Sequence, residues 1–139
     1  MPDILVDAGP LVALLHKDDR DHALCVDVLK HLREPLLSTW MPVTEAMYLL
    51  GFSVDAQGAL LQMIERGVLR ILSLEADDLP GIRKLMQQYA DLPMDFADAT
   101  LVQVARKHGI DQIFTLDRRD FAVYRLRRGK AFTIIPDAI

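Results

Sequence analysis

The stretch that decides the fold is ILVDAGPL, residues 4–11. Its first three residues are all apolar, which is typical of a short strand buried on both faces of a sheet. Asp7-Ala8-Gly9-Pro10 ends this strand, and Pro10 suits the first position of a following helix, which we expect over residues 11–15. A buried strand that leads directly into a helix is typical of α/β proteins.

The same alternation of short apolar strands and helices continues along the chain. We expect further strands at residues 36–39, 68–72, 113–115 and 131–135. We expect further helices at residues 21–33, 42–50 and 54–66, from 77 to about 89, and, after a break at Pro93, from a cap at Asp95 to His108. This order predicts a three-layer α/β/α fold with a central parallel sheet covered by helices on both faces.

Length and composition indicate one globular domain spanning residues 1–139. The chain weighs 15.7 kDa, and 51% of its residues are hydrophobic and 26% charged. Sixteen basic and 20 acidic residues give a net charge of −4. This balance excludes a strongly basic nucleic-acid binder as a description of the whole chain, although it leaves room for a local basic patch.

The cysteine count and the apolar runs predict a cytoplasmic protein. Cys25 is the single cysteine, so no disulfide forms within the chain and a reducing compartment is expected. The N-terminus lacks the basic region of a signal peptide. The apolar runs are far shorter than the ~20 residues that span a bilayer, so we expect no contact with a membrane.

Acidic residues recur where strands end and helices begin. Asp7 and Asp117 each follow a predicted strand, Glu45 lies in the first turn of the helix opened by Pro42, and Asp98 lies near the start of the helix capped by Asp95. Ligands of parallel α/β sheets bind beyond the carboxyl ends of the strands. We therefore expect these carboxylates at one rim of the sheet.

Helix capping is the alternative explanation for each acid taken alone, because carboxylates are favourable at helix N-termini. Convergence of several acids is different, since their charges repel each other and raise their pKa values. A divalent cation such as Mg²⁺ or Mn²⁺ would remove that conflict. Zinc is disfavoured, because His22 and Cys25 form one pair without a second.

A basic segment follows the last of these acids. Residues 117–130 read DRRDFAVYRLRRGK and hold six of the 16 basic residues, with Phe121 and Tyr124 between them. The six are Arg118, Arg119, Arg125, Arg127, Arg128 and Lys130. A solvated surface is one interpretation. The other is a flank that binds phosphate beside the acids, for which Arg118, Arg119 and Arg125 are the candidates.

Four segments in this order resemble the PIN domain family, and within it the VapC-type ribonuclease toxins. The segments are residues 4–11, 44–46, 95–99 and 114–121. The resemblance covers nearly the whole chain and implies a parallel, five-stranded sheet between helices, in agreement with the pattern of strands. A phosphatase of the haloacid dehalogenase type is a poorer match, because it needs a second Asp where this chain has Gly9.

The resemblance also implies a catalytic site. Asp7, Glu45, Asp98 and Asp117 match the four acids that carry catalysis and hold Mg²⁺ or Mn²⁺, and Thr115 matches a hydroxyl residue that supports the fourth acid. Asp95 is an extra acid, which would cap the helix or orient a water molecule. The implied reaction is the metal-dependent hydrolysis of RNA phosphodiester bonds.

Partners are implied by the resemblance as well. Toxins of this type belong to type II toxin-antitoxin pairs, in which a small antitoxin covers the active site, and they commonly form homodimers. The alternative function is a non-catalytic PIN-like module that binds RNA or protein. Leu14, Leu15 and Met47 could contact a partner, but their helical spacing favours the core.

Overall fold

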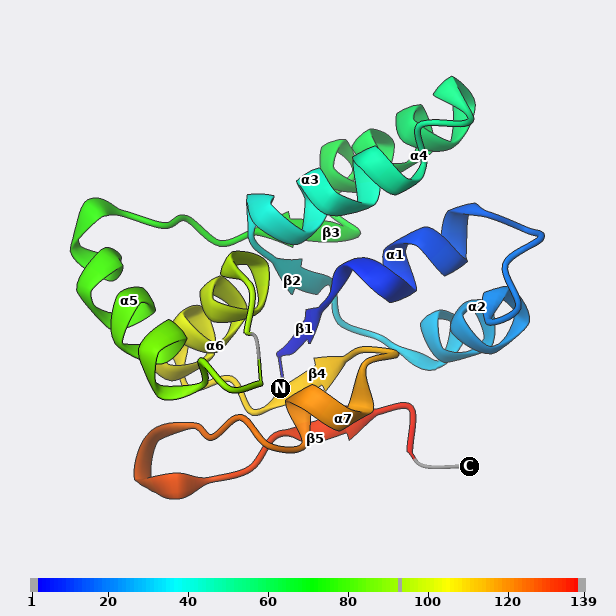
Figure 1. Cartoon of the computed structure of the whole chain (residues 1–139). Coiled ribbons are helices and arrows are strands. Elements are labelled where there is room, and N and C mark those ends of the chain that lie inside the picture. Colours follow the sequence, from blue (N-terminus) through cyan, green and yellow to red (C-terminus); the bar gives the residue numbers. More distant parts are fainter. Residues whose placement is uncertain (1–2, 93, 138–139) are drawn as a thin grey trace.

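A computed structural model, which describes residues 3–92 and 94–137, contains a parallel sheet between two layers of helices (Figure 1). Its strands, in the described residues, are β1 (Ile4–Val6), β2 (Leu36–Ser38), β3 (Leu69–Ile71), β4 (Gln112–Phe114) and β5 (Thr133–Ile135). All neighbouring strands are parallel, in the order β3-β2-β1-β4-β5. The predicted fold class is thus confirmed. The expected break at Pro93 lies outside the described residues.

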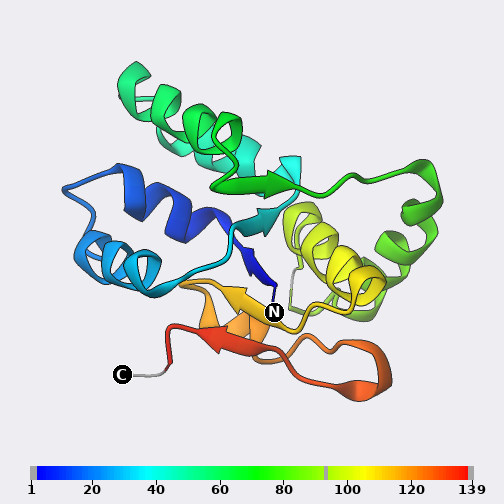
Figure 2. The same ribbon diagram turned by 180° about the vertical axis from the view of Figure 1, so that it is seen from behind.

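Helices cover both faces of the sheet (Figures 1 and 2). They are α1 (Ala8–Leu15), α2 (His22–His31), α3 (Trp40–Leu49), α4 (Val54–Glu65), α5 (Leu79–Gln88), α6 (Phe96–His108) and the short α7 (Arg118–Phe121), with single 3₁₀ turns at Ala76–Asp78 and Arg127–Gly129. One buried cluster joins the sheet to α1–α4, and a second joins it to α5, α6 and α7. No helix in the described part of the chain is long and apolar enough to cross a membrane.

The central strand β1 contributes to both cores. Ile4 and Val6 belong to the cluster under α1–α4, whereas Leu5, between them, belongs to the cluster under α5 and α6. Leu5 lies in register with Leu37 of β2 and Ile113 of β4. This alternation explains the run of apolar residues at 4–6, since neither face of β1 meets water.

Two helices begin earlier than the sequence predicts. Helix α1 starts at Ala8 with Asp7 as its cap, and α3 starts at Trp40 with Thr39 as its cap. In each helix the proline, Pro10 or Pro42, is the third helical residue rather than the first. The first turn tolerates proline because its backbone N–H groups have no acceptor within the helix. Glu45 therefore lies in the second turn of its helix, and its predicted place in the first turn is wrong.

Leu14, Leu15 and Met47 are partly buried and pack against the core, as their spacing predicts. Exposed apolar side chains occur elsewhere, around the turn that joins α3 to α4. Tyr48 is 84% exposed and Phe52 61% exposed. Such aromatic side chains on a surface often mark an interaction site.

Burial on both sides makes Leu5 a sensitive core position, because it is fully buried on the central strand. The Leu5→Ala variant should lose about 2–5 kcal/mol of the free energy of unfolding, as expected for a methyl-lined cavity in a core. Urea denaturation followed by circular dichroism measures this loss. The matched control is Leu61→Ala on α4, which is 43% exposed and should change stability by about 0.5 kcal/mol or less. Equal losses in the two variants would contradict the assigned core.

Candidate active site

Asp7 lies where β1 ends, in contact with the segment that follows β4. Its Oδ1 accepts a hydrogen bond of 2.8 Å from the N–H of Ala8, which caps α1. Its Oδ2 accepts a hydrogen bond of 3.0 Å from the hydroxyl of Thr115. The Thr115 hydroxyl also accepts a hydrogen bond of 2.9 Å from the backbone N–H of Asp117. Thr115 thus links the first and the fourth of the predicted acids.

Asp98 lies in the first turn of α6, where two residues hold it. Asp95 caps the helix, because its Oδ1 accepts a hydrogen bond of 2.8 Å from the N–H of Asp98. The hydroxyl of Tyr124 donates a hydrogen bond of 3.0 Å to Oδ2 of Asp98. Asp7 and Asp98 are each 8% exposed, so both carboxylates are buried at this rim.

A pair of threonines brings Glu45 toward the other acids. The hydroxyls of Thr39, the cap of α3, and Thr100 of α6 share a buried hydrogen bond of 2.8 Å. Thr100 also donates to the carbonyl of Ala97, at 2.7 Å. These bonds fix the start of α3 beside the start of α6. Glu45 lies on the second turn of α3, and its side chain is exposed.

The two buried acids have raised pKa values, to which neighbouring carboxylates contribute. Burial, with smaller contributions from the charges of Glu45 and Asp117, raises the pKa of Asp7 from 3.8 to about 6. This rise occurs despite the lowering effect of the hydrogen bonds from Ala8 and Thr115. Burial, followed by the charge of Asp7, raises the pKa of Asp98 to about 8. Like charges that perturb one another in this way lie within a few ångströms to about a nanometre of each other.

The two more exposed acids belong to the same electrostatic group. Partial burial, and then the charge of Asp95, raises the pKa of Glu45. Partial burial also raises the pKa of Asp117, whose carboxylate accepts a hydrogen bond of 3.4 Å from the N–H of Asp120. The four acids predicted from the sequence thus remain candidates for one site, with Glu45 on the second rather than the first turn of its helix.

Capping explains part of this arrangement but not all of it. Asp7, Asp95 and Asp117 each cap a helix. Capping hydrogen bonds stabilise the ionised carboxylate and lower its pKa. The raised pKa values of Asp7 and Asp98 arise instead from burial and from like charge. Moreover, in the described part of the chain neither residue forms a salt bridge with a basic side chain.

The donor set fits a hard divalent cation. Buried carboxylates without a basic partner supply the charge and the oxygen ligands that Mg²⁺ and Mn²⁺ prefer. Across residues 3–92 and 94–137, however, the side chains as placed form no group of three or more His, Cys, Asp or Glu residues that could hold a metal ion.

The basic segment is divided by the fold. Lys130 forms an ion pair with Asp111, which precedes β4, whereas Arg118 and Arg119 begin α7 directly after Asp117, which follows β4. The two ends of the segment therefore lie at opposite rims of the sheet. The reason is the turn after α7, which returns the chain to the beginning of β5.

Contacts distinguish the three arginines nearest to the acids. The guanidinium of Arg118 donates to the carbonyl of Pro136, and that of Arg125 donates to the carbonyls of residues 122–124. Arg119 is exposed, and its charge lowers the pKa of Asp117. Within the described residues, Arg119 is the one of the three whose guanidinium makes no hydrogen bond.

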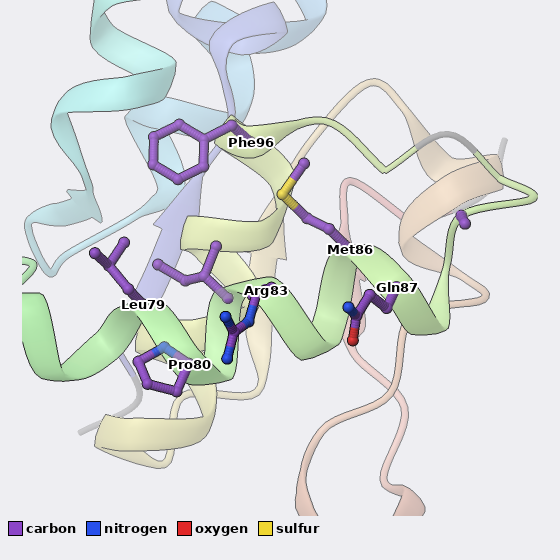
Figure 3. Close-up of a pocket in the computed structure, with 8 residues that line it drawn as sticks. Leu79, Pro80, Arg83, Met86, Gln87 and Phe96 are labelled. Atoms are coloured by element: carbon purple, nitrogen blue, oxygen red, sulfur yellow. The ribbon is translucent and has the colours of Figure 1, made fainter.

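A separate apolar groove of about 640 Å³ runs along α5 (Figure 3). Leu79, Arg83 and Met86 of α5 line it together with Phe96, the first residue of α6. Leu79 is 53% and Phe96 45% exposed. The groove thus borders the helix that carries Asp98, but no predicted site residue lines it.

Two contacts at the site could not be predicted from the sequence. Tyr124 was recognised only as an aromatic residue within a basic segment, although its hydroxyl contacts Asp98. The Thr39–Thr100 pair joins positions 61 residues apart. Neither contact has a local signature, because each depends on helices that meet only in the folded chain.

Comparisons with known proteins find a matching family model and a relative that spans nearly the whole chain. The model of a family described as PIN domain matches residues 4–126. The chain is 28% identical over 135 residues to "Ribonuclease VapC26" of Mycobacterium tuberculosis, an alignment that covers 96% of this chain and all of the relative.

Solved structures show the same fold. A crystal structure of VapC20 from M. tuberculosis, described as a sarcin-ricin loop cleaving toxin, has a TM-score of 0.77 and 21% identity, over 84% of this chain and 92% of that chain. A toxin-antitoxin complex from Klebsiella pneumoniae has a TM-score of 0.65 and 16% identity, over 87% of this chain and 92% of that chain.

The raised pKa values predict how the stability of the metal-free protein depends on pH. The folded state binds a proton on Asp98 more tightly than the unfolded state does. This contribution to stability is full below about pH 4 and is lost as the pH rises through the folded pKa of about 8. Asp7 adds to the same trend up to about pH 6.

The Asp98→Asn variant removes the larger of these two contributions. In chelator-treated protein, its free energy of unfolding should fall less steeply than that of wild type between about pH 5 and pH 9, as urea denaturation at several pH values would measure. Asp91→Asn is the matched control, because Asp91 is exposed, and it should keep the wild-type slope. An unchanged slope in Asp98→Asn would contradict the buried, charge-coupled carboxylate.

Proposed function

The chain belongs to the PIN domain family, and from this premise we propose that it is a divalent-metal-dependent endoribonuclease of the VapC type. The observation that carries the proposal is the pair of buried, mutually repelling carboxylates, Asp7 at the end of β1 and Asp98 at the start of α6, with the more exposed Asp117 following β4. The ribonuclease name of VapC26 and the description of VapC20 as a sarcin-ricin loop cleaving toxin support RNA as the substrate.

In this proposal Asp7, Asp98 and Asp117 hold Mg²⁺ or Mn²⁺, with Glu45 as a further ligand or as the group that orients the attacking water. The bound ion supplies Lewis-acid stabilisation of the negative charge that develops on the scissile phosphate. Carboxylate oxygens suit this task because they are hard ligands. Each Asp7 oxygen accepts one hydrogen bond from the protein, and a carboxylate oxygen has a second lone pair for a ligand.

The other residues of the site have supporting tasks. Thr115 fixes the carboxylate of Asp7, and Asp95 fixes the first turn of α6. Glu45 is exposed and its pKa is raised, which suits a carboxylate that must orient water and accept a proton from it. Arg119, exposed beside Asp117, is the strongest candidate for contact with an RNA phosphate. Arg118 and Arg125 are weaker candidates, because one end of each guanidinium already donates to backbone carbonyls.

We further propose that this single nuclease domain is the toxin of a type II toxin-antitoxin pair, that it forms a homodimer and that it acts in the cytoplasm. Neighbours in fold support the antitoxin partner, because they include a toxin-antitoxin complex. The exposed aromatic side chains near the turn between α3 and α4 are surfaces that a partner could cover.

Removing the acids should abolish cleavage. Asp7→Asn and Asp98→Asn should each lower the rate of Mg²⁺- or Mn²⁺-dependent cleavage of RNA with single-stranded segments by more than about 100-fold, because each loses a charged ligand. Thr115→Val, which keeps all four acids, should lose less, about 10–100-fold. Gel-based cleavage of a labelled RNA measures the rates.

The controls separate this proposal from a non-catalytic RNA-binding module. Asp91→Asn alters an exposed acid outside the group and should cleave as wild type does. Circular dichroism should show that all variants remain folded. Wild-type rates in Asp98→Asn would refute the assigned site, and RNA binding without any cleavage by wild type would favour the module.

Metal binding should be visible without RNA. Because a ligand that binds only the folded state stabilises it by about 2.7 kcal/mol at 100 times its Kd, Mn²⁺ should raise the melting temperature of the wild-type protein. Asp98→Asn should show a much smaller rise, whereas Asp91→Asn should match wild type. A melting temperature of the wild-type protein that does not respond to Mn²⁺ would favour helix capping as the whole role of these acids.

A further inference from the structure

Tyr124 is a buried aromatic residue whose hydroxyl faces the acidic site. Its side chain has no exposed surface, and its ring packs edge-on against the rings of Tyr89 and Phe121, with centroids 5.0 and 5.1 Å away. A ring held on two sides in this way has few positions available to its hydroxyl. The hydroxyl donates a hydrogen bond of 3.0 Å to Oδ2 of Asp98.

This hydrogen bond holds one oxygen of the Asp98 carboxylate. In the described part of the chain, Tyr124 is the one donor that contacts this carboxylate, and Oδ1 accepts no hydrogen bond. Asp7 is held in the same way by the hydroxyl of Thr115. The two buried acids of the site are thus each oriented by a neutral hydroxyl, which fixes a carboxylate without adding a positive charge that would compete with a cation.

We propose that Tyr124 is a positioning residue, which holds the carboxylate of Asp98 in one orientation so that its free oxygen is available to a divalent cation. This inference rests on the proposed metal-dependent function. Without the hydroxyl, binding of the cation must also order the Asp98 side chain, and the affinity falls. Groups that orient metal ligands in this way typically contribute about 10–100-fold to metal affinity.

Tyr89 provides a matched control in the same aromatic cluster. Its ring packs against that of Tyr124, and its hydroxyl accepts a hydrogen bond of 2.9 Å from the backbone N–H of Arg125. It therefore resembles Tyr124 in burial and in having one hydrogen bond, but its partner is a backbone amide and not the Asp98 carboxylate. Tyr89→Phe reports what the loss of a hydroxyl from this cluster does by itself.

The experiment measures Mn²⁺ binding to the whole chain by isothermal titration calorimetry without RNA, well below the melting temperature of each variant. Tyr124→Phe should weaken Mn²⁺ binding about tenfold, while Tyr89→Phe should stay within about twofold of wild type, since loss of a structural contact alone leaves the ligands in place. If Tyr124→Phe does not fold, 4-fluorophenylalanine at position 124 takes its place, because it fills the space of the hydroxyl but cannot donate.

The outcomes distinguish this inference from the function on which it rests. Unchanged Mn²⁺ affinity in Tyr124→Phe, with binding by wild type intact, overturns the positioning role and leaves the metal site standing. Equal weakening in Tyr124→Phe and Tyr89→Phe also overturns it, since packing of the cluster then explains the loss. No binding of Mn²⁺ by wild type overturns the metal-dependent function together with this inference.

Discussion

Asp7 and Asp98 are buried carboxylates that repel each other. The other contacts of the site follow from the need to stabilise this pair. Buried charge is costly unless it is hydrogen-bonded or paired. The protein meets this cost with neutral donors: the hydroxyls of Thr115 and Tyr124 and the backbone N–H of Ala8. In the described part of the chain, neither acid forms a salt bridge with a basic side chain. The pKa values of both acids therefore remain raised.

The parallel sheet is what makes this constraint possible. Neighbouring parallel strands end at the same rim, so residues that follow β1 and β4 meet although they are 108 positions apart in the Asp7–Thr115 contact. The hydrogen bond of 3.0 Å from the N–H of Asp7 to the carbonyl of Phe114 continues the ladder to this point. Helix α6, which lies on the other face of the sheet from α1, contributes Asp98. The hydrogen bond between Thr39 and Thr100 holds the start of α6 beside α3.

Sequence reasoning predicted the parts of this structure that have local causes. The strand at 4–6, the cap at Asp95 and the end of α6 at His108 follow from apolar runs, capping residues and a glycine, and all were confirmed. The start of α3 was wrong, because a threonine cap and a proline in the first turn give competing signals. Tyr124 could not be assigned a task, since its contact with Asp98 depends on the turn that follows α7. The same turn separates Lys130 from Arg119, which the linear sequence places in one patch.

Helix termini explain why the acids tolerate one another without basic partners. Helices α1 and α6 both begin at the acidic rim, and each N-terminus carries the equivalent of about half a positive charge. This positive potential comes from backbone dipoles, so it stabilises carboxylates without occupying them as a lysine or arginine side chain would. The compensation is partial, because burial and like charge still raise the pKa values of Asp7 and Asp98 above 3.8. The buried carboxylates therefore keep an unfavourable electrostatic free energy, which a bound divalent cation would lower. The stability of the fold and its affinity for metal are thus coupled through the same two carboxylates.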